Sequence, residues 1–230
     1  MSMKVRRLKR SVRLVQHGCV LSDTPRTAEA THSVFDVLAA AVAEFAPAGR
    51  VAMLGFAGGG MVAPLRKAGA RHPVHAVDLC ADGHRLYRGL AKSWGGAVRF
   101  EQDDAVRWLR RQRAKFAAIV EDLSVPQAGD VVKPEASWRQ LPGMMGRKLH
   151  PDGVVVANLL PTPGITWGGM IAEARLPGLP AVIIGLDGYH NRVLLQGRAA
   201  GSPRDVGARL RRRLQDIGSG LAAQLAVRRA

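Results

Sequence analysis

The chain has 230 residues, of which 47% are apolar and 5% aromatic. This length suits one full-sized domain and this apolar fraction excludes a disordered chain, so we expect a single globular domain with an aliphatic core. The 34 basic and 18 acidic residues give a net charge of +16, which disfavours polycationic ligands. Two explanations of this charge stay open: a solvated surface rich in Arg, or a surface that binds an anionic partner.

The cysteines and the N-terminus indicate the compartment, and the cysteines and histidines indicate whether a metal site is present. Cys19 and Cys80 lie far apart in no metal-binding spacing, so we expect two free thiols in a reducing environment. The seven histidines show no metal-binding spacing either. No secretory signal follows the basic N-terminus, and no apolar run approaches the roughly 20 residues of a membrane span. The sequence therefore predicts a cytoplasmic protein without a metal site.

Residues 1–25 predict a short β-hairpin extension, because His17 and Gly18 separate two β-prone runs. Residues 26–230 are expected to form the main domain. It begins with a helix over 27–46, where apolar residues recur at helical spacing before the segment PAG ends it.

Strands and helices alternate along the centre of the chain. Short apolar runs predict strands at 51–55, 74–78, 97–101, 117–121 and 153–159, and helices are predicted at 60–70, 82–93, 104–114 and 136–149. This alternation predicts βαβ units in a mostly parallel sheet, with helices on both faces. The strand sequences VAMLG, AAIVE and VVVANLL are apolar nearly throughout, as burial on both faces requires.

The pattern changes after residue 160. A helix is predicted over 165–175, and Asp187-Gly188 between two β-prone runs predicts an antiparallel hairpin. The tail predicts a final basic amphipathic helix, with Ser202 as its N-cap and Pro203 at its first position.

The residues that follow the predicted strands form the candidate site, because open α/β sheets bind ligands beyond the carboxyl ends of their strands. The strand at 51–55 ends in GFAGGG, where small residues permit a sharp turn close to a ligand. About 20 residues later the next strand ends at Asp78, where an acid can bind a ribose diol. A nucleotide-binding turn and a tight structural turn with a surface acid both remain consistent with this pattern.

Three polar residues follow later strands. Asp104 opens a predicted helix, which it can cap. Asp122 precedes a Pro-containing loop. An acid at this position can act on a substrate, or it can simply form the turn. Asn158 ends the fifth strand and can bond a ligand or its own loop. The chain contains no G-x-S-x-G elbow, no P-loop and no exact G-x-G-x-x-G spacing, which disfavours hydrolase, P-loop and dinucleotide sites.

Over roughly residues 30 to 197, the chain resembles the spermidine synthase-like branch of the class I S-adenosylmethionine-dependent methyltransferases. MLGFAGGGMVAPLRK is similar to the glycine motif of that branch, with Ala57 where glycine is usual. VHAVDL, VRFEQDDAVRWL, FAAIVEDLSVP and LHPDGVVVANLL are similar to its next strand segments. The resemblance implies a Rossmann-like sheet of seven strands with an antiparallel last strand.

The resemblance also implies a ligand. It would be S-adenosylmethionine, its decarboxylated form, methylthioadenosine or S-adenosylhomocysteine, with Asp78 on the ribose, Asp104 at the adenine amino group and Asp122 near the reacting atoms. The cofactor-binding residues implied in this way are Gly55, Ala57, Gly58, Gly59, Asp78, Leu79, Asp104, Ala105 and Asp122, with Asp122 also catalytic.

The chain departs from true aminopropyltransferases at two positions. Val125 stands where a second polyamine-binding acid is usual, and Cys80 stands where a second acid follows the ribose-binding one. These losses and the net charge argue against a polyamine acceptor.

Three functions follow. We favour transfer of a methyl or aminopropyl-type group to an unidentified small-molecule acceptor that is not a polyamine. The alternatives are true aminopropyl transfer to a polyamine, and a degenerate protein that binds nucleic acid or a protein partner. A homodimer is also consistent with the resemblance. The basic residues of the third reading would be Arg6, Arg7, Lys9, Arg10, Arg13, Arg209, Arg211, Arg212 and Arg213.

Overall fold

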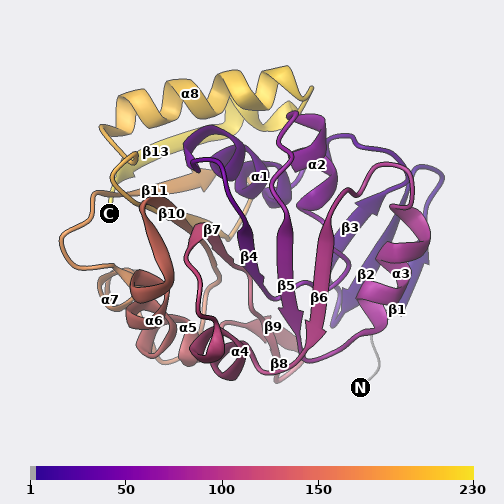
Figure 1. The fold of residues 1–230 in the computed structure, drawn as a ribbon, viewed down its shortest axis with the longest axis horizontal. Coiled ribbons are helices and arrows are strands. Elements are labelled where there is room, and N and C mark those ends of the chain that lie inside the picture. The colour runs from indigo at the N-terminus through magenta and orange to yellow at the C-terminus, as the bar shows by residue number, and fades with distance from the viewer. Residues whose placement is uncertain (1–3) are drawn as a thin grey trace.

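The computed structural model describes residues 4–230, which form one large mixed sheet with helices on both faces and a small N-terminal sheet beside it (Figure 1). The large sheet has eight strands in the order β13-β11-β12-β10-β7-β4-β5-β6, and β12 and β13 run antiparallel to their neighbours. Its strands are β4 (Val51–Leu54), β5 (Val74–Asp78), β6 (Val98–Gln102), β7 (Phe116–Glu121), β10 (Leu149–Leu159), β11 (Ala181–Leu186), β12 (Arg192–Gln196) and β13 (Leu225–Arg229).

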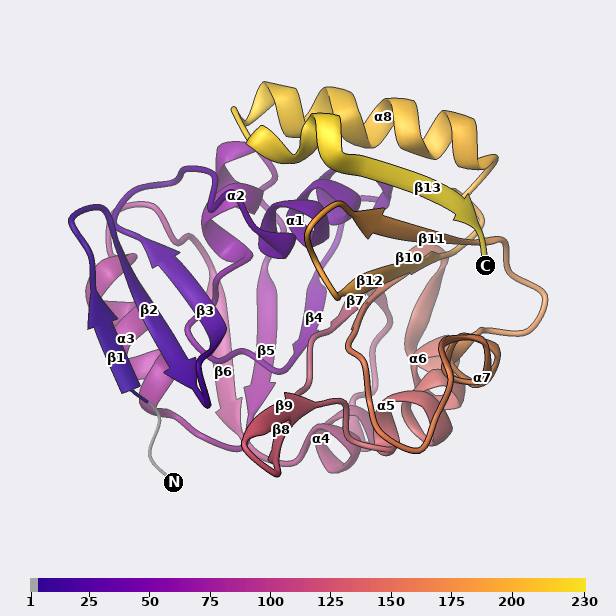
Figure 2. The same ribbon diagram turned by 180° about the vertical axis from the view of Figure 1, so that it is seen from behind.

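The helices form two layers on this sheet, and the two layers are visible from behind as well (Figure 2). α1, α2 and α8 pack on one face, α4 to α7 pack on the other, and α3 lies near the β6 edge against the N-terminal sheet. Their bounds are α1 (Val34–Phe45), α2 (Val62–Lys67), α3 (Asp82–Leu90), α4 (Ala105–Arg111), α5 (Ala136–Arg139), α6 (Leu141–Lys148), α7 (Trp167–Ala174) and α8 (Pro203–Asp216), with a 3-10 turn at Gly220–Gln224.

The predicted burial of the central strands on both faces is confirmed. In β4, Val51 and Met53 pack into the core beneath α1 and α2, whereas Ala52 and Leu54 pack into the core beneath α4 and α6. Successive strand residues point to opposite faces, so a strand covered on both sides must be apolar at every position. This double burial holds β4 and β7 at the centre of the sheet, where their carboxyl ends define the site.

The N-terminal extension forms the predicted hairpin and one further strand. β2 (Ser11–Gln16) and β3 (Cys19–Pro25) pair around His17 and Gly18, which both have positive φ values, 50° and 81°. β1 (Lys4–Arg7) adds a third antiparallel strand. Residues 1–3 of the predicted extension lie outside the described residues. The small sheet reaches the glycine-rich turn, because Thr24 Oγ1 donates a 2.6 Å hydrogen bond to the carbonyl of Gly58.

Two predicted helices are wrong in extent, each for a local reason. The helix predicted from residue 27 begins at Val34, because the Asp36 carboxylate accepts hydrogen bonds from the backbone N–H groups of Thr31 and His32 and holds them outside the helix. The helix predicted over 136–149 is divided into α5 and α6 just before Pro142, whose ring lacks the N–H that a continuous helix requires.

The C-terminal helix is also shorter than predicted. Ser202 caps α8 as expected, since its Oγ accepts from the Asp205 N–H at 3.1 Å. The helix ends at Asp216, because Gly218 takes φ of 75° and the Ser219 N–H turns back to the Leu214 carbonyl. The residues that follow form β13, an eighth strand where seven were expected. The predicted Asp187-Gly188 hairpin is confirmed by the pairing of β11 with β12.

Within residues 4–230, no helix combines the length and the apolar character that crossing a bilayer would require.

A pair of glycines in α3 tests how tightly this helix packs on the glycine-rich turn. A Cβ at Gly83 would collide with the Ala57 carbonyl oxygen, whereas a Cβ at Gly89 would meet nothing within 4 Å. We expect Gly83→Ala to lower the free energy of unfolding by roughly 1–3 kcal/mol through overpacking. Gly89→Ala should raise it by up to about 1 kcal/mol, because alanine favours the helix. Urea unfolding followed by circular dichroism measures both, and equal effects would contradict the packing described.

Candidate functional site

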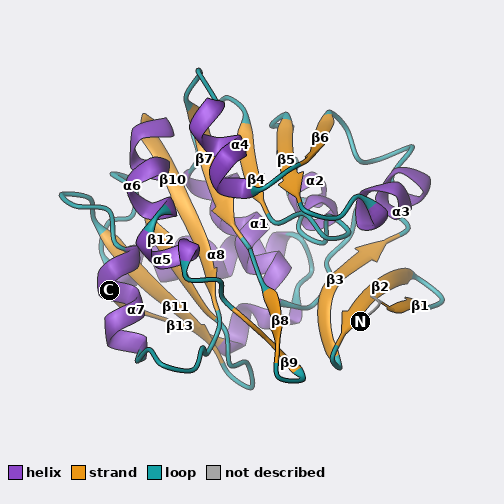
Figure 3. Cartoon of the chain, turned by 90° about the horizontal axis from the view of Figure 1, so that it is seen from below, coloured by secondary structure: helices purple, strands orange, loops and turns teal. Residues whose placement is uncertain are grey.

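A cavity of about 940 Å³ opens at the carboxyl edge of the large sheet, between this edge and the small N-terminal sheet. A short hairpin, β8 (Val125–Gln127) and β9 (Asp130–Val132), lines another side of it. Figure 3 shows where this hairpin lies in the fold. Most of the predicted site residues line this one cavity. They are Gly55, Ala57, Asp78, Leu79, Asp104, Ala105 and Asp122.

The turn after β4 is held by Asp78. Its Oδ2 accepts hydrogen bonds from the backbone N–H groups of Phe56 at 2.9 Å and Ala57 at 2.8 Å, and its Oδ1 accepts one from Cys80 at 3.0 Å. Gly55 has φ of 86°, and a Cβ there would come within 2.6 Å of the Asp122 carbonyl oxygen, so only glycine fits. Asp78 thus fixes the turn, and its Oδ1 can still accept a further bond from a ligand hydroxyl.

Gly58 and Gly59 do not line the cavity. Gly58 lies beneath the N-terminal sheet, where a Cβ would come within 2.8 Å of Ser22 Oγ. Gly59, with φ of 71°, packs against the rings of Phe56 and Tyr87. In the structure, these two glycines allow the turn to pack closely against its neighbours on both sides.

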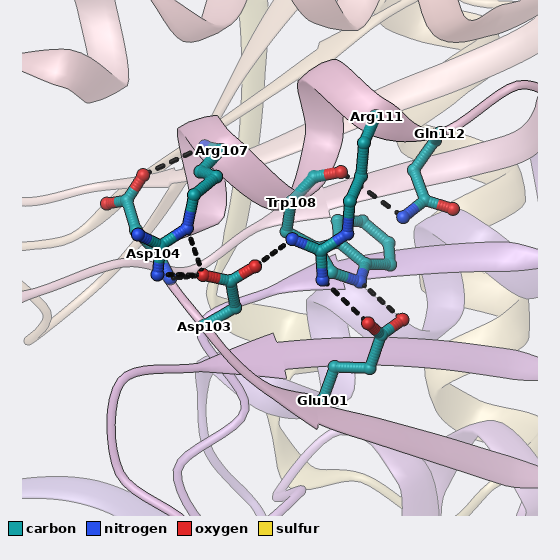
Figure 4. Close-up of polar contacts among 7 residues, drawn as sticks. All are labelled: Glu101, Asp103, Asp104, Arg107, Trp108, Arg111 and Gln112. Carbon is teal, nitrogen blue, oxygen red and sulfur yellow. Dashed lines mark hydrogen bonds and ion pairs between the residues drawn. The ribbon is translucent and has the colours of Figure 1, made fainter.

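Acids and arginines form a network around the end of β6 (Figure 4). Hydrogen bonds from Arg107 and Arg111 lower the pKa of Asp103 to about 2. Glu101 binds Arg111 and accepts a 2.8 Å hydrogen bond from Trp108 Nε1, and these contacts lower its pKa. The network therefore pairs both arginines with acids at the β6 edge of the sheet.

Asp104 caps α4, as its position in the sequence indicated. Its Oδ1 accepts from the Arg107 N–H at 2.8 Å, and the residue is exposed at the cavity wall. Capping uses one of its two oxygens, so the other is free to meet a ligand in the cavity.

Asp122 lies at the end of β7, at the centre of the sheet edge. Asn158 Nδ2 donates to its Oδ1 at 2.7 Å, and Asn191 Nδ2 donates to Asn158 Oδ1 at 3.0 Å. Burial raises the pKa of Asp122 to about 6, although the charge of Lys133 opposes this shift. Its Oδ2 accepts no hydrogen bond from residues 4–230. Asp122 is therefore a carboxylate with one free oxygen, held in place by two amides.

A buried ion pair involves Glu121, the residue that precedes Asp122. Lys133 Nζ contacts Glu121 Oε1 at 2.8 Å, and both side chains are fully buried. The same oxygen accepts from Ser137 Oγ at 2.9 Å and from the Leu123 N–H at 3.0 Å. Lys133 also donates to the Leu123 carbonyl at 2.7 Å. The pair thus ties the end of β7 to the segment after β9 and neutralises the carboxylate next to Asp122.

Sequence reasoning missed Lys133 and the part played by Asn191. Lys133 lies in the segment VVKPEASW, where one lysine carries no spacing signal that would mark it as buried. Asn191 immediately precedes β12, and its pairing with Asn158 depends on the contact between β10 and β12, which no local pattern reveals.

Comparison with known proteins rests on the structure, since no family model and no curated protein match the chain. Human methyltransferase-like protein 13 in complex with SAH superposes with a TM-score of 0.61 at 16% identity, covering 80% of this chain and 90% of that one. A spermidine synthase in complex with the transition-state analogue AdoDATO gives 0.65 at 12%, covering 95% and 80%. The spermidine synthase from Thermotoga maritima gives 0.61 at 10%, covering 95% and 75%.

The chain has the class I S-adenosylmethionine-dependent methyltransferase fold. Its similarity to spermidine synthases extends over more of the chain than its similarity to the human methyltransferase-like protein. The methyltransferase fold accounts for the parallel strands and the antiparallel β12, and β13 is an addition to the seven strands expected.

Several of the basic residues considered for nucleic-acid binding are engaged within this fold. Arg13 pairs with Asp23 at 2.6 Å, and Arg211 donates to the Leu225 carbonyl. Arg209 and Arg213 both bind Glu44 of α1, and although burial opposes the shift, their hydrogen bonds lower its pKa. Arg13 thus joins β2 to β3, and the other three arginines hold α8 against α1 and β13. The remaining basic residues considered are exposed: Arg6, Arg7, Lys9 and Arg10 lie on and just after β1, and Arg212 lies on α8.

The buried ion pair predicts a large effect of a single substitution. Lys133→Met removes the only charge on residues 4–230 that contacts the buried Glu121 carboxylate, so we expect a loss of about 3–5 kcal/mol in the free energy of unfolding. The double variant Glu121→Gln/Lys133→Met carries no charge at this buried pair and should recover most of this loss. Urea unfolding of the three proteins measures the difference. A single variant as stable as the unchanged chain would contradict the ion pair.

Proposed function

We propose that the protein is a transferase that binds S-adenosylmethionine or a close relative and moves a carbon group to a small acceptor held at Asp122. The observation that carries this proposal is the convergence of the turn after β4, Asp78, Asp104 and Asp122 on one cavity. A volume of about 940 Å³ lies near the upper end of the ~300–1,000 Å³ typical of ligand pockets. It therefore gives room for a nucleoside and a second molecule.

The charges of the cavity fit a cationic sulfonium. Among residues 4–230, six aspartates and no lysine or arginine line it. The net charge of +16 therefore does not extend to the cavity wall, where a positive sulfur is favoured and a phosphate is repelled. The aspartates are Asp78, Asp82, Asp103, Asp104, Asp122 and Asp130.

Each part of the ligand has a residue of matching chemistry. Asp78 would accept from the ribose hydroxyls, Asp104 from the adenine amino group, and the backbone after Gly55 would lie against the nucleoside. The bound sulfonium supplies an activated carbon, so the chain mainly has to position a nucleophile. Asp122 does this by accepting a hydrogen bond from the acceptor and taking its proton, for which a pKa of about 6 is well placed near neutral pH.

The group transferred is, in this proposal, methyl. Val125 and Cys80 both line the cavity as neutral side chains, so the two positions give a polyamine no carboxylate. Aminopropyl transfer stays the second candidate, because the similarity to spermidine synthases covers 95% of the chain. Nucleic acid is disfavoured as an acceptor by the acidic wall.

Removal of Asp78 tests the nucleoside site. We expect Asp78→Ala to weaken binding of S-adenosylhomocysteine at least tenfold, since it removes a ribose partner and loosens the turn held at Phe56 and Ala57. Calorimetric titration measures the binding, and a thermal melt verifies that the domain stays folded. The matched control is Asp152→Ala, because Asp152 is an exposed acid at the opposite end of the sheet. Unchanged binding by the Asp78 variant would overturn the assignment.

The pH dependence tests the role of Asp122. Its ionised form is the base, so log kcat/KM for transfer should rise with unit slope below about pH 6 and level off above it. Asp122→Asn should lower kcat/KM by roughly 10²–10⁴-fold and remove this limb, because the amide cannot take a proton. Initial rates of S-adenosylhomocysteine formation between pH 5 and 8 provide the measurement. A variant that kept the limb would show that another group titrates.

A further inference from the structure

Seven consecutive exposed residues, Lys4 to Arg10, form the outer strand of the small N-terminal sheet and the turn after it. Their sequence, KVRRLKR, contains five cations, two aliphatic side chains and no acid. β1 pairs with β2, and in the turn the Leu8 N–H donates to the Ser11 carbonyl at 2.8 Å. Because these seven residues follow one another along the chain, they form one continuous surface, which we call the basic edge.

The cations of the basic edge face solvent. None of the ion pairs within residues 4–230 includes one of them. On the next strand, by contrast, Arg13 pairs with Asp23 at 2.6 Å. The cations of the basic edge therefore remain available to an external anion, and the net charge of +16 adds a long-range attraction to an anionic surface.

Aliphatic side chains are exposed among these cations. Large hydrophobic side chains are exposed at only four positions within residues 4–230, and two of these positions belong to the basic edge. Val5 is 51% exposed and Leu8 is 41% exposed, and Val20 of β3 in the same sheet is 44% exposed. Charged side chains often protect an outer strand from pairing with another chain, which would account for the cations alone. Such protection does not account for exposed aliphatic side chains beside them, which together mark a binding surface.

The combination of cations and aliphatic side chains indicates the kind of anionic partner. Single-stranded nucleic acids are bound by cations together with aromatic side chains on which the bases stack, and residues 4–25 contain no Phe, Tyr or Trp. At an anionic bilayer, Lys and Arg meet the headgroups while apolar side chains enter the boundary between headgroups and acyl chains. The basic edge presents both kinds of side chain in one stretch, so it matches an anionic bilayer.

The basic edge also lies at the opening of the cavity. Val5 and Val20 both line the cavity and are about half exposed, so they lie where the cavity meets solvent. Leu8 follows Val5 by three positions, which is roughly 10 Å along an extended chain. A bilayer in contact with the basic edge would therefore lie beside this opening.

We infer that the basic edge docks the protein on the surface of an anionic lipid bilayer, with Val5 and Leu8 in the boundary region and the five cations against lipid headgroups. Docking of this kind is peripheral and requires no segment that crosses the bilayer. The inference goes beyond the proposed function, because it concerns a surface outside the reaction and holds whether or not the cavity binds S-adenosylmethionine. It places the opening of the cavity beside the lipid headgroups.

Sedimentation with lipid vesicles tests the inference on the full chain. Vesicles of phosphatidylcholine mixed with phosphatidylserine should bind the protein at least roughly tenfold more tightly than vesicles of phosphatidylcholine alone, because each cation near an anionic surface strengthens binding about fivefold. Absence of binding to the mixed vesicles, or equal binding to both kinds of vesicle, would overturn the inference.

A double variant separates the basic edge from the net charge of the chain. Arg6→Gln/Lys9→Gln should weaken binding to the mixed vesicles roughly 25-fold, about fivefold for each cation removed. The matched control is Arg110→Gln/Arg212→Gln, which removes the same charge from exposed positions on α4 and α8 and should weaken binding by roughly threefold at most. Thermal melts verify that both variants fold. Equal weakening by the two variants would show that net charge alone attracts the vesicles, and the basic edge would not be the docking surface.

Leu8 distinguishes a bilayer from other polyanions. Leu8→Ser keeps every charge and should weaken binding to the mixed vesicles by roughly fivefold, because it removes an apolar side chain from the boundary region. Binding to oligouridylate and to polyglutamate should be weaker than binding to vesicles and unaffected by this substitution. If a folded Leu8→Ser variant bound vesicles as tightly as the unchanged chain, or if either polymer bound more tightly than vesicles, the partner would be a nucleic acid or an acidic protein and the inference would be wrong.

Discussion

The carboxylate of Asp78 holds the turn on which the other parts of the site rest. Two backbone N–H groups of the turn bind it, so the turn after β4 is fixed to the end of β5. The N-terminal sheet then binds the turn through Thr24, and α3 packs on it so closely that only glycine fits at position 83. Asp78 thus fixes the turn against which the small sheet and α3 pack, and this turn forms part of the cavity wall.

Charge is distributed unevenly over this protein. Arg107 and Arg111 are held by Asp103 and Glu101, and Arg209 and Arg213 of α8 are held by Glu44. These cations stabilise the fold, and none of them lines the cavity. The wall itself is acidic. Total charge therefore predicts little about the ligand, because a field near a cavity depends on the few groups that line it.

Local patterns in the sequence were sufficient to predict the central strands and the positions of the three acids at the sheet edge. Burial on both faces leaves a continuous apolar run, and a strand end followed by an acid is visible in the chain, as at Asp78 and Asp122. Lys133 and β13 could not be predicted in this way. Lys133 is buried only because Glu121, twelve residues earlier, is placed beside it by the return of the chain through the β8–β9 hairpin. β13 is a strand because β11 offers it an unpaired edge, which no local pattern of LAVRR reveals.

Asp122 differs from the residues across the cavity in how strongly the fold constrains it. Its strand, β7, is paired on both sides, so change there disturbs β4 and β10 together. Other side chains that line the cavity, such as Val20 and Val125, belong instead to the N-terminal sheet and to the β8–β9 hairpin, neither of which pairs with a strand of the large sheet. Substitutions in these two small elements can therefore reshape the cavity wall while the sheet and its central carboxylate stay unaltered.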